Sequence, residues 1–171
     1  MVSLRRAGAL AVALTLCYTL AGCAQSPPEA RRAPAGGQQQ KELMAAAWAG
    51  DVRRMEALIN AGADVNARDQ DLGTPLVAAA YSGDPDAVRL LLERGAEVDA
   101  KDGEGLTPLM NASLNGRAEV ARLLLAKGAD VNAVSSRTVD GTQVEVTALK
   151  LARGKRQADV IEILQRAGAK E

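Results

Sequence analysis

The chain has 171 residues, a length that suits one ordinary domain, and its 21 basic and 21 acidic side chains leave no formal net charge. Proteins that bind nucleic acid present a basic stripe or a strongly basic domain, so this balance excludes nucleic acid as the main partner. The sequence contains no His, which removes the commonest general base and the commonest metal ligand and weighs against catalysis.

Residues 1–22 have the layout of a secretory signal peptide. Arg5 and Arg6 precede an apolar run at residues 9–20, and small residues follow it. The run is shorter than the roughly 20 apolar residues that a transmembrane helix needs, so we expect cleavage. Cleavage removes two basic residues and no acid, which leaves the mature chain slightly acidic.

The end of this segment, Leu20, Ala21, Gly22 and Cys23, resembles the lipobox of bacterial lipoproteins. The resemblance implies diacylglycerol on the Cys23 sulfur, cleavage before Cys23 and acylation of the new amine, for instance by palmitate. Two or three chains anchor stably, because each buried methylene contributes about 0.8 kcal/mol. In that family Ala24, rather than Asp, implies an outer-membrane protein that faces the periplasm. The alternative is an ordinary secretory peptide followed by a Cys through chance.

Residues 23–39 are expected to form the lipidated Cys and a flexible linker. Their Pro, Gly and Gln residues cannot bury apolar surface, so the segment is interpreted as a tether between membrane and domain. Cys17 would leave with the signal peptide and Cys23 would carry lipid. No thiol then remains for a disulfide, a metal or nucleophilic catalysis.

Three markers recur along the rest of the chain at a step of 33 residues. The markers are GADVN at 62–66, GAEVD at 95–99 and GADVN at 128–132, the triplet TPL at 74–76 and 107–109, and the glycines Gly50, Gly83 and Gly116. Three independent markers with one period predict a repeat protein. We place the repeats at about 40–68, 69–101, 102–134 and 140–171.

Each unit is expected to contain a helix, a tight turn, a second helix and an extended finger. Thr74 is expected to cap the first helix, Pro75 to occupy its first position, and Gly95 to end the second helix in the left-handed conformation. Apolar residues in each second helix fall at helical spacing, which gives every unit one apolar face. The outer units carry polar replacements, Arg54 and Gln165, which we interpret as end caps.

The order of the markers resembles the ankyrin repeat, which is about 33 residues long and starts its first helix with Thr-Pro-Leu. The resemblance implies an all-α solenoid of helix-turn-helix units with β-hairpin fingers, over residues 40–171. Two departures stand out. The His that follows Thr-Pro-Leu in the family is absent from every repeat, where the residues are Met44, Val77, Met110 and Lys150. The hydrogen bonds of that His are therefore expected to be absent or made by other residues. Arg156 stands where the inter-helix Gly is expected, so the last turn is expected to differ and to use Gly154 instead.

The third finger is seven residues longer than the second, with the insertion at residues 134–146. Asp140-Gly141 lies between the alternating segments 137–139 and 142–146, a pattern that predicts a two-stranded hairpin. Partner contacts concentrate on such long loops. The alternative is a mobile excursion without a role, since isolated two-stranded ribbons are marginally stable.

Ankyrin-family proteins bind with the finger tips and the concave face of the first helices, and we transfer this role only to positions in matching register. Trp48, Tyr81 and Leu114 occupy one equivalent position and include every aromatic residue of the mature chain. Exposed apolar groups in line commonly mark a protein contact, although packing onto neighbouring helices is the alternative. The polar candidates around this stripe are Ser82, Asn115, Arg68, Gln70, Asp71, Lys101, Glu104, Arg137 and Asp140.

We predict no catalytic residues, no cofactor, no metal and no small-molecule substrate. Asp64, Asp69 and Asp71 lie close in sequence, but no twelve-residue calcium loop surrounds them. The chain is expected to be a monomer that binds another protein, anchored to the membrane through Cys23. One hypothesis is that it regulates or protects an envelope protein of its own cell. Alternatives are an immunity protein that neutralises a toxin or effector enzyme in the periplasm, and an assembly scaffold.

Overall fold

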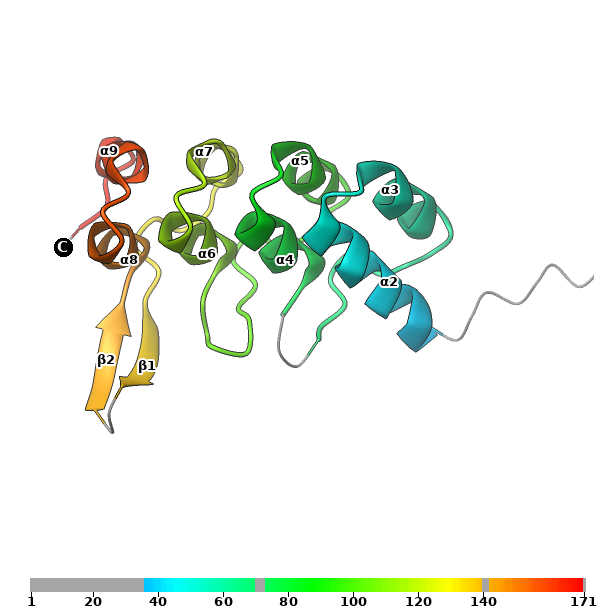
Figure 1. Ribbon diagram of the computed structural model, residues 1–171, viewed down its shortest axis with the longest axis horizontal. Coiled ribbons are helices and arrows are strands. Elements are labelled where there is room, and N and C mark those ends of the chain that lie inside the picture. The colour runs from blue at the N-terminus through cyan, green and yellow to red at the C-terminus, as the bar shows by residue number, and fades with distance from the viewer. Residues whose placement is uncertain (1–35, 70–72, 140–141, 171) are drawn as a thin grey trace, which may run out of the picture. The chain divides into compact units, whose positions relative to one another are not determined.

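The computed structural model describes residues 36–69, 73–139 and 142–170. These residues form eight helices and one two-stranded sheet (Figure 1). In chain order the elements are α2 (Gly36–Ala49), α3 (Val52–Asn60), α4 (Pro75–Ser82), α5 (Pro85–Glu93), α6 (Pro108–Leu114), α7 (Ala118–Ala126), β1 (Ser135–Val139), β2 (Thr142–Val146), α8 (Ala148–Gly154) and α9 (Ala158–Arg166).

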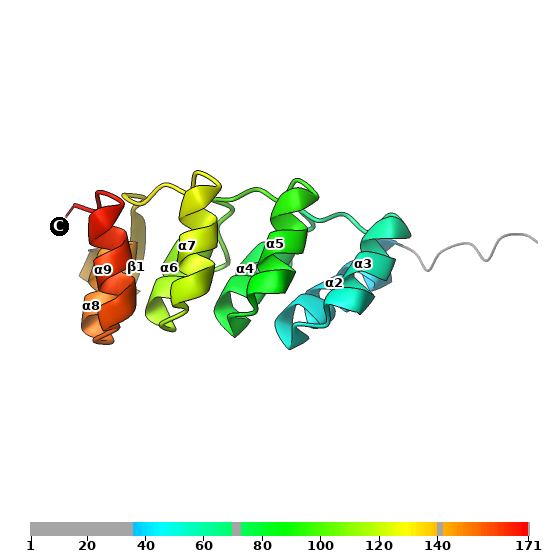
Figure 2. The same ribbon diagram turned by 90° about the horizontal axis from the view of Figure 1, so that it is seen from above.

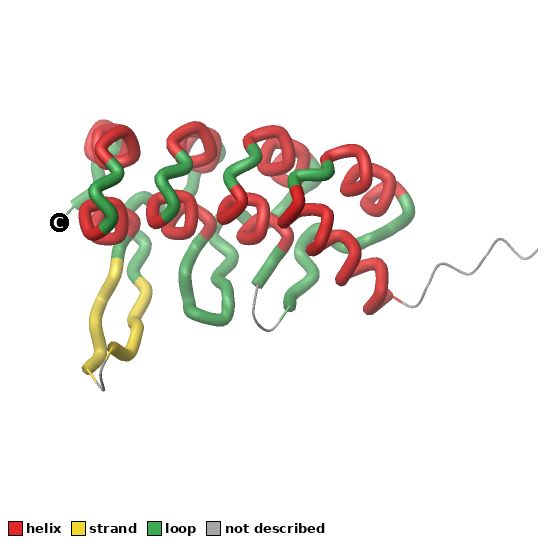
Figure 3. The backbone as a smooth tube through the Cα atoms, in the orientation of Figure 1, coloured by secondary structure: helices red, strands yellow, loops and turns green. Residues whose placement is uncertain are grey.

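The helices pair into four hairpins that stand side by side, and the helix packing between hairpins joins neighbours in the row (Figures 1 and 2). The helices α2, α4, α6 and α8 pack against one another in sequence, and we call them the first-helix row. The helices α3, α5, α7 and α9 form the second-helix row in the same way. The fingers extend from the first-helix row on the side away from the second helices (Figure 3). The predicted all-α stack of helical hairpins with fingers is confirmed.

The middle hairpins are covered on both sides, and their composition permits this. In α4 and α6, six residues each are buried, because small side chains such as Ala79 and Ala112 let neighbouring helices approach closely. The second helices bury one face only, for example Val120, Ala121 and Leu124 in α7. Chains of this kind gain stability from contacts between neighbours rather than from one central core.

The first helix, α2, is longer than its counterparts, with 14 residues against seven or eight. It begins at Gly36, so residues 36–39, which composition placed in the linker, are helical. Gln and Lys are good helix formers, and nothing between Gly37 and Leu43 interrupts the helix. The Gln40 amide N–H donates to the Asp64 carbonyl and its amide oxygen accepts from the Asp64 N–H, each at 3.2 Å. This pairing fastens the added turn to the first finger.

The expected Thr caps are only partly present. The Thr107 hydroxyl accepts from the Met110 N–H at 3.3 Å, and the Thr147 hydroxyl accepts from the Lys150 N–H at 3.2 Å. Thr74 was expected to do the same, but its side chain makes no capping bond, and its buried Oγ1 has no partner among the described residues. In α4 the fixed φ of Pro75 is therefore the remaining local start signal.

The turns between paired helices require a left-handed residue, and the last turn obtains it in an unexpected way. Gly83 and Gly116 adopt φ values of 90° and 69°. Gly154 was predicted to serve the last turn, but that prediction is wrong, since Arg156 itself has φ 57°. A Cβ on Gly83 would overlap Arg117, and one on Gly116 would overlap Gln157. Each overlapping residue belongs to the next hairpin, and within the described residues no further hairpin lies against Arg156, so a side chain fits there.

Both ends of the stack are polar, as predicted. Arg54 is exposed and forms an ion pair of 3.3 Å with Glu42, and Gln165 is exposed as well. The far end has a second pair of polar replacements that was not predicted from the sequence. Met110 and Ser113 are fully buried in α6, whereas the matching residues of α8, Lys150 and Arg153, are exposed.

Each helix in the described part of the chain is too short or too polar to cross a lipid bilayer.

Candidate protein-binding surface

An exposed aromatic pair lies on the first two members of the first-helix row. Trp48 near the end of α2 is 44 % exposed, and Tyr81 near the end of α4 is 40 % exposed. Their ring centroids are 4.8 Å apart, with an angle of 19° between the ring planes, so the rings are stacked. Such a pair is worth about 0.5 to 1.5 kcal/mol beyond the area it buries. The sequence predicted that Trp48 and Tyr81 occupy equivalent positions on neighbouring first helices, but it did not predict that their rings touch.

The helical period explains this position. The residues directly before the pair, Ala47 and Ala80, are fully buried between neighbouring helices. The next residue along each helix is turned by about 100° and leaves that interface. Because α2 and α4 pack side by side, the two rings meet at the surface.

The third member of the predicted stripe contributes less. Leu114 in α6 is half-buried, and the equivalent residue of α8 is Gly154, which has no side chain. The stripe therefore narrows along the row. Ser82 and Asn115, which follow Tyr81 and Leu114, are half-buried and bonded to their own helices. The Ser82 hydroxyl donates to the Ala79 carbonyl at 3.0 Å, and the Asn115 amide donates to the Asn111 carbonyl at 2.9 Å.

A shallow hollow of about 460 Å³ adjoins Trp48. Its walls are Lys41, Met44 and Ala45 of α2, together with Asp69 of the first finger. The indole ring is therefore in reach of both an apolar floor and two charged side chains of opposite sign. An apolar centre with a polar rim is the usual anatomy of a protein interface.

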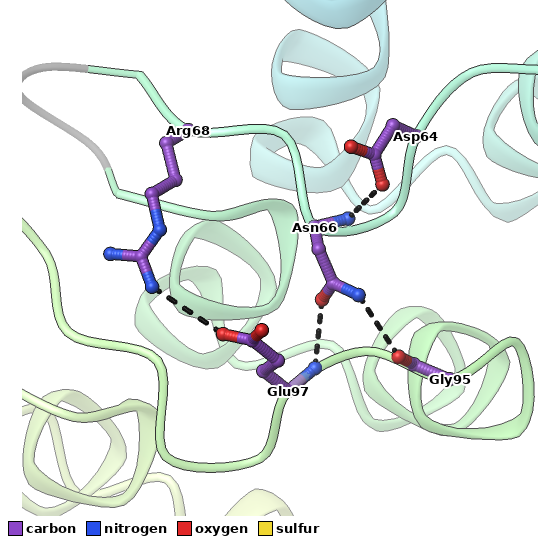
Figure 4. Close-up of polar contacts among 5 residues, drawn as sticks. All are labelled: Asp64, Asn66, Arg68, Gly95 and Glu97. Carbon is purple, nitrogen blue, oxygen red and sulfur yellow. Dashed lines mark hydrogen bonds and ion pairs between the residues drawn. The ribbon is translucent and has the colours of Figure 1, made fainter.

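Two of the described finger candidates link neighbouring fingers, and a third is bonded within its own finger. The Arg68 guanidinium pairs with the Glu97 carboxylate at 3.4 Å, as Figure 4 shows. The Lys101 ammonium donates to the Val134 carbonyl at 3.1 Å. The Glu104 N–H donates to the Asp102 carboxylate at 2.9 Å, inside the second finger.

Three further candidates, Gln70, Asp71 and Asp140, lie outside the described residues, as does the side chain of Arg137.

Asn66 makes the closest polar link between the first two hairpins (Figure 4). Its amide donates to the Gly95 carbonyl at 3.1 Å and accepts from the Glu97 N–H at 2.8 Å. Asn132 repeats the arrangement with the Gly168 carbonyl and the Lys170 N–H. At the matching position between them, Asp99 accepts from the Asp130 N–H at 3.1 Å but has no amide to donate.

The base of the second finger is fixed by a buried amide. Asn111, 4 % exposed, donates to Asp102 Oδ2 at 2.8 Å, and the other carboxylate oxygen accepts from the Leu106 N–H at 2.8 Å. Because the family's His is missing here, its hydrogen bonds were expected to be either absent or made by another residue. In this finger, Asn111 supplies such a bond from the position after Met110.

The third finger is a two-stranded antiparallel hairpin, as predicted, with Val139 paired to Thr142 and Ser135 paired to Val146. The hairpin base packs against the second finger, since Ser135 is buried and a Cβ on Gly105 would lie 2.8 Å from its hydroxyl. Val144 shares a face with the half-buried Val146 but is 40 % exposed. Val144 was not among the predicted protein-binding residues, although the alternation of side chains along β2 places it on the same face as Val146.

No cluster of three or more metal-ligating side chains occurs within residues 36–69, 73–139 and 142–170.

Helical hairpins stacked in one row, with fingers along one edge, define a helical-repeat protein. The family model for ankyrin repeats (3 copies) matches residues 43–135, more than half of the chain. The protein therefore belongs to the ankyrin-repeat family, whose members typically bind other proteins rather than catalyse reactions. No curated protein matches the chain in sequence.

Proposed function

We propose that this protein is a lipid-anchored component of the bacterial cell envelope, faces the periplasm and binds another protein, which it regulates or protects. The observation that carries the proposal is the exposed stack of Trp48 and Tyr81. The described chain contains no other aromatic side chain, and two large rings that stay partly exposed to water lose part of the hydrophobic stabilisation that full burial would give them.

The stacked pair is suited to binding because its geometry is set in advance. Each ring limits the rotamers of the other, so less side-chain entropy is lost when a partner covers them. Trp and Tyr are also the residues most often found at the energetic centre of a protein interface. The charged fingers then provide a rim that adds selectivity more than affinity.

The proposed membrane anchor rests on the sequence around Cys23, outside the described residues. The lipobox resemblance and the preceding charged and apolar segments support acylation of Cys23. A short tether would then keep the binding surface near the membrane, where an envelope partner is at high local concentration.

The binding proposal predicts that Trp48→Ala with Tyr81→Ala weakens capture of the partner from an envelope extract by at least tenfold, because two central anchors are removed. The matched control is Trp48→Phe with Tyr81→Phe, which keeps two stacked rings and should retain most of the affinity. Trp48 is the single tryptophan of the chain, so its fluorescence reports contact at this position directly.

If the Ala variant has the circular dichroism of the parent protein and still captures every specific partner, the aromatic pair is not the binding site. Should the captured partner be a toxic enzyme whose activity the protein blocks, the immunity hypothesis replaces regulation or protection of an envelope protein.

The anchor proposal predicts that Cys23→Ser abolishes labelling by radioactive palmitate. The expected product is either an uncleaved precursor or a protein in the soluble periplasmic fraction, since Ser offers no sulfur for the diacylglycerol. Unchanged labelling and unchanged membrane association in this variant would exclude Cys23 as the lipid site.

A further inference from the structure

Formal charge changes along the first-helix row. Counting each first helix with the turn after it, residues 41–51 carry −1 from Lys41, Glu42 and Asp51. Residues 74–84 carry −1 from Asp84, and residues 107–117 carry +1 from Arg117. The last segment, 147–157, carries +4. We call its four cations the basic end: Lys150, Arg153, Lys155 and Arg156. Each matching segment of the second-helix row, by contrast, stays between −1 and +1.

The cations of the basic end are exposed, and three of the four form no ion pair with any residue that the structure describes. Six arginines elsewhere in the described structure form ion pairs with carboxylates. Among the described residues, no such pair involves Lys150, Lys155 or Arg156. The Lys150 ammonium donates at 3.3 Å to the Glu145 carbonyl, a neutral group that leaves its charge in place.

The backbone at Arg156 is a second and independent observation. A non-glycine residue in the left-handed region is strained, and glycine fills this position in the three earlier turns. Strain that the chain retains where a simpler residue would fit is an indicator of function. Arg156 adds a fourth positive charge to a surface that already carries Lys150, Arg153 and Lys155.

End capping explains only part of this composition. Lys150 and Arg153 occupy positions that a following hairpin would bury, so polar side chains are needed there. Capping does not require that both be basic. It also does not account for Lys155, whose equivalents Ala49, Ser82 and Asn115 are all uncharged.

The basic end continues the line of the aromatic pair. Gly154 holds the position equivalent to Trp48 and Tyr81, and Lys155 and Arg156 follow it directly. The first-helix row therefore presents aromatic side chains at one end and cations at the other.

From these observations we infer that the protein bound by the first-helix row is recognised through an acidic segment, which lies on the basic end while an apolar part of the same partner covers Trp48 and Tyr81. The inference rests on the proposed function and adds the chemistry of the partner. An anionic bilayer fits less well, because it would meet the whole row, and the first two segments of that row carry net negative charge.

The test uses the chain from residue 24 onward, which keeps the whole fold because every residue of the buried core lies between Leu43 and Leu164. The probe is a fluorescein-labelled peptide of ten Glu residues, measured by anisotropy at low and at high NaCl. A ten-Gln peptide is the probe control. The parent chain should bind the Glu peptide, and salt should weaken that binding, because exposed charges are screened.

The variant Lys155→Gln with Arg156→Gly should bind the Glu peptide at least fivefold more weakly. Folding should not confound this result, since glycine suits the left-handed turn. Arg53→Gln with Lys127→Gln removes the same charge from the second-helix row and should change binding less than twofold. An equal loss in this control, or equal binding of the Gln peptide, would overturn the inference. Binding to phosphatidylglycerol vesicles without binding to the Glu peptide would assign the basic end to lipid instead.

The same variants separate this inference from the proposed function. A natural partner that is lost with Trp48→Ala and Tyr81→Ala, but kept with Lys155→Gln and Arg156→Gly, overturns the acidic-segment inference alone. A partner that survives both pairs of substitutions overturns the binding surface as a whole.

Discussion

Replacing Gly116 by Ala should lower the free energy of unfolding by about 1 to 2 kcal/mol, whereas replacing Arg156 by Gly should raise it by about 1 kcal/mol. Both residues occupy the left-handed position of an inter-helix turn. A side chain there costs about 1 to 2 kcal/mol from backbone strain. At Gly116 the added Cβ also meets the end of the Gln157 side chain, which is flexible and can move aside, so this overlap adds little to the cost.

Urea unfolding followed by circular dichroism measures both changes. Gly154→Ala is the matched control, because Gly154 is helical and a Cβ on it meets nothing within 4 Å. Helix propensity predicts that this variant is slightly more stable than the parent. If Gly116→Ala is as stable as Gly154→Ala, the left-handed conformation of Gly116 carries no energetic cost for a side chain.

Asn66→Ala should cost about 2 kcal/mol, since it removes two hydrogen bonds that join the first and second hairpins, at about 1 kcal/mol each. Because a stack of repeats is held together by contacts between neighbours, we expect the first hairpin to unfold before the others. Trp48 lies in that hairpin, so the fluorescence transition should occur at lower urea than the transition seen by circular dichroism.

Two further substitutions test the same geometry at the other junctions. Asn132→Ala should weaken the last hairpin and leave the Trp48 transition nearly unchanged. Asp99→Asn should stabilise the chain by about 1 kcal/mol, because an amide there has a donor for the Gly128 carbonyl, as Asn66 has for Gly95. A single shared transition in Asn66→Ala, or a loss of stability in Asp99→Asn, would contradict this account of the junctions.

The repeat period made the architecture predictable, because GADVN, TPL and the turn glycines recur with one spacing and each has a known backbone role. Even the hairpin of the third finger was readable from Asp140-Gly141 and its alternating flanks. Errors arose where a residue's role depends on its neighbours in space. Thr74 has the right chemistry for a cap but makes no such bond. The last turn was expected to use Gly154, but Arg156 itself adopts the left-handed conformation, because no described neighbour lies where its Cβ points.

The candidate surface was predictable to a smaller extent. Register placed Trp48 and Tyr81 in one line, but stacking depends on rotamers, which a sequence pattern does not specify. Lys150 and Arg153 were not predicted to be exposed at the end of the stack. Their alignment with Met110 and Ser113 could have shown it, because two charged residues replace an apolar and a small one. Arg68 was predicted from its charge to lie at the polar edge of the binding surface. The structure pairs its guanidinium with the Glu97 carboxylate of the next finger.

The exposed cations at positions Lys150 and Arg153 also determine how the molecule ends. An open-ended helical stack could continue by adding the first hairpin of one molecule to the last hairpin of another, which produces filaments rather than closed oligomers. Two positive charges on α8 oppose that junction, because burial of charged groups removes them from water at a cost. The same two side chains that face solvent at α8 therefore disfavour end-to-end association of two copies of the chain.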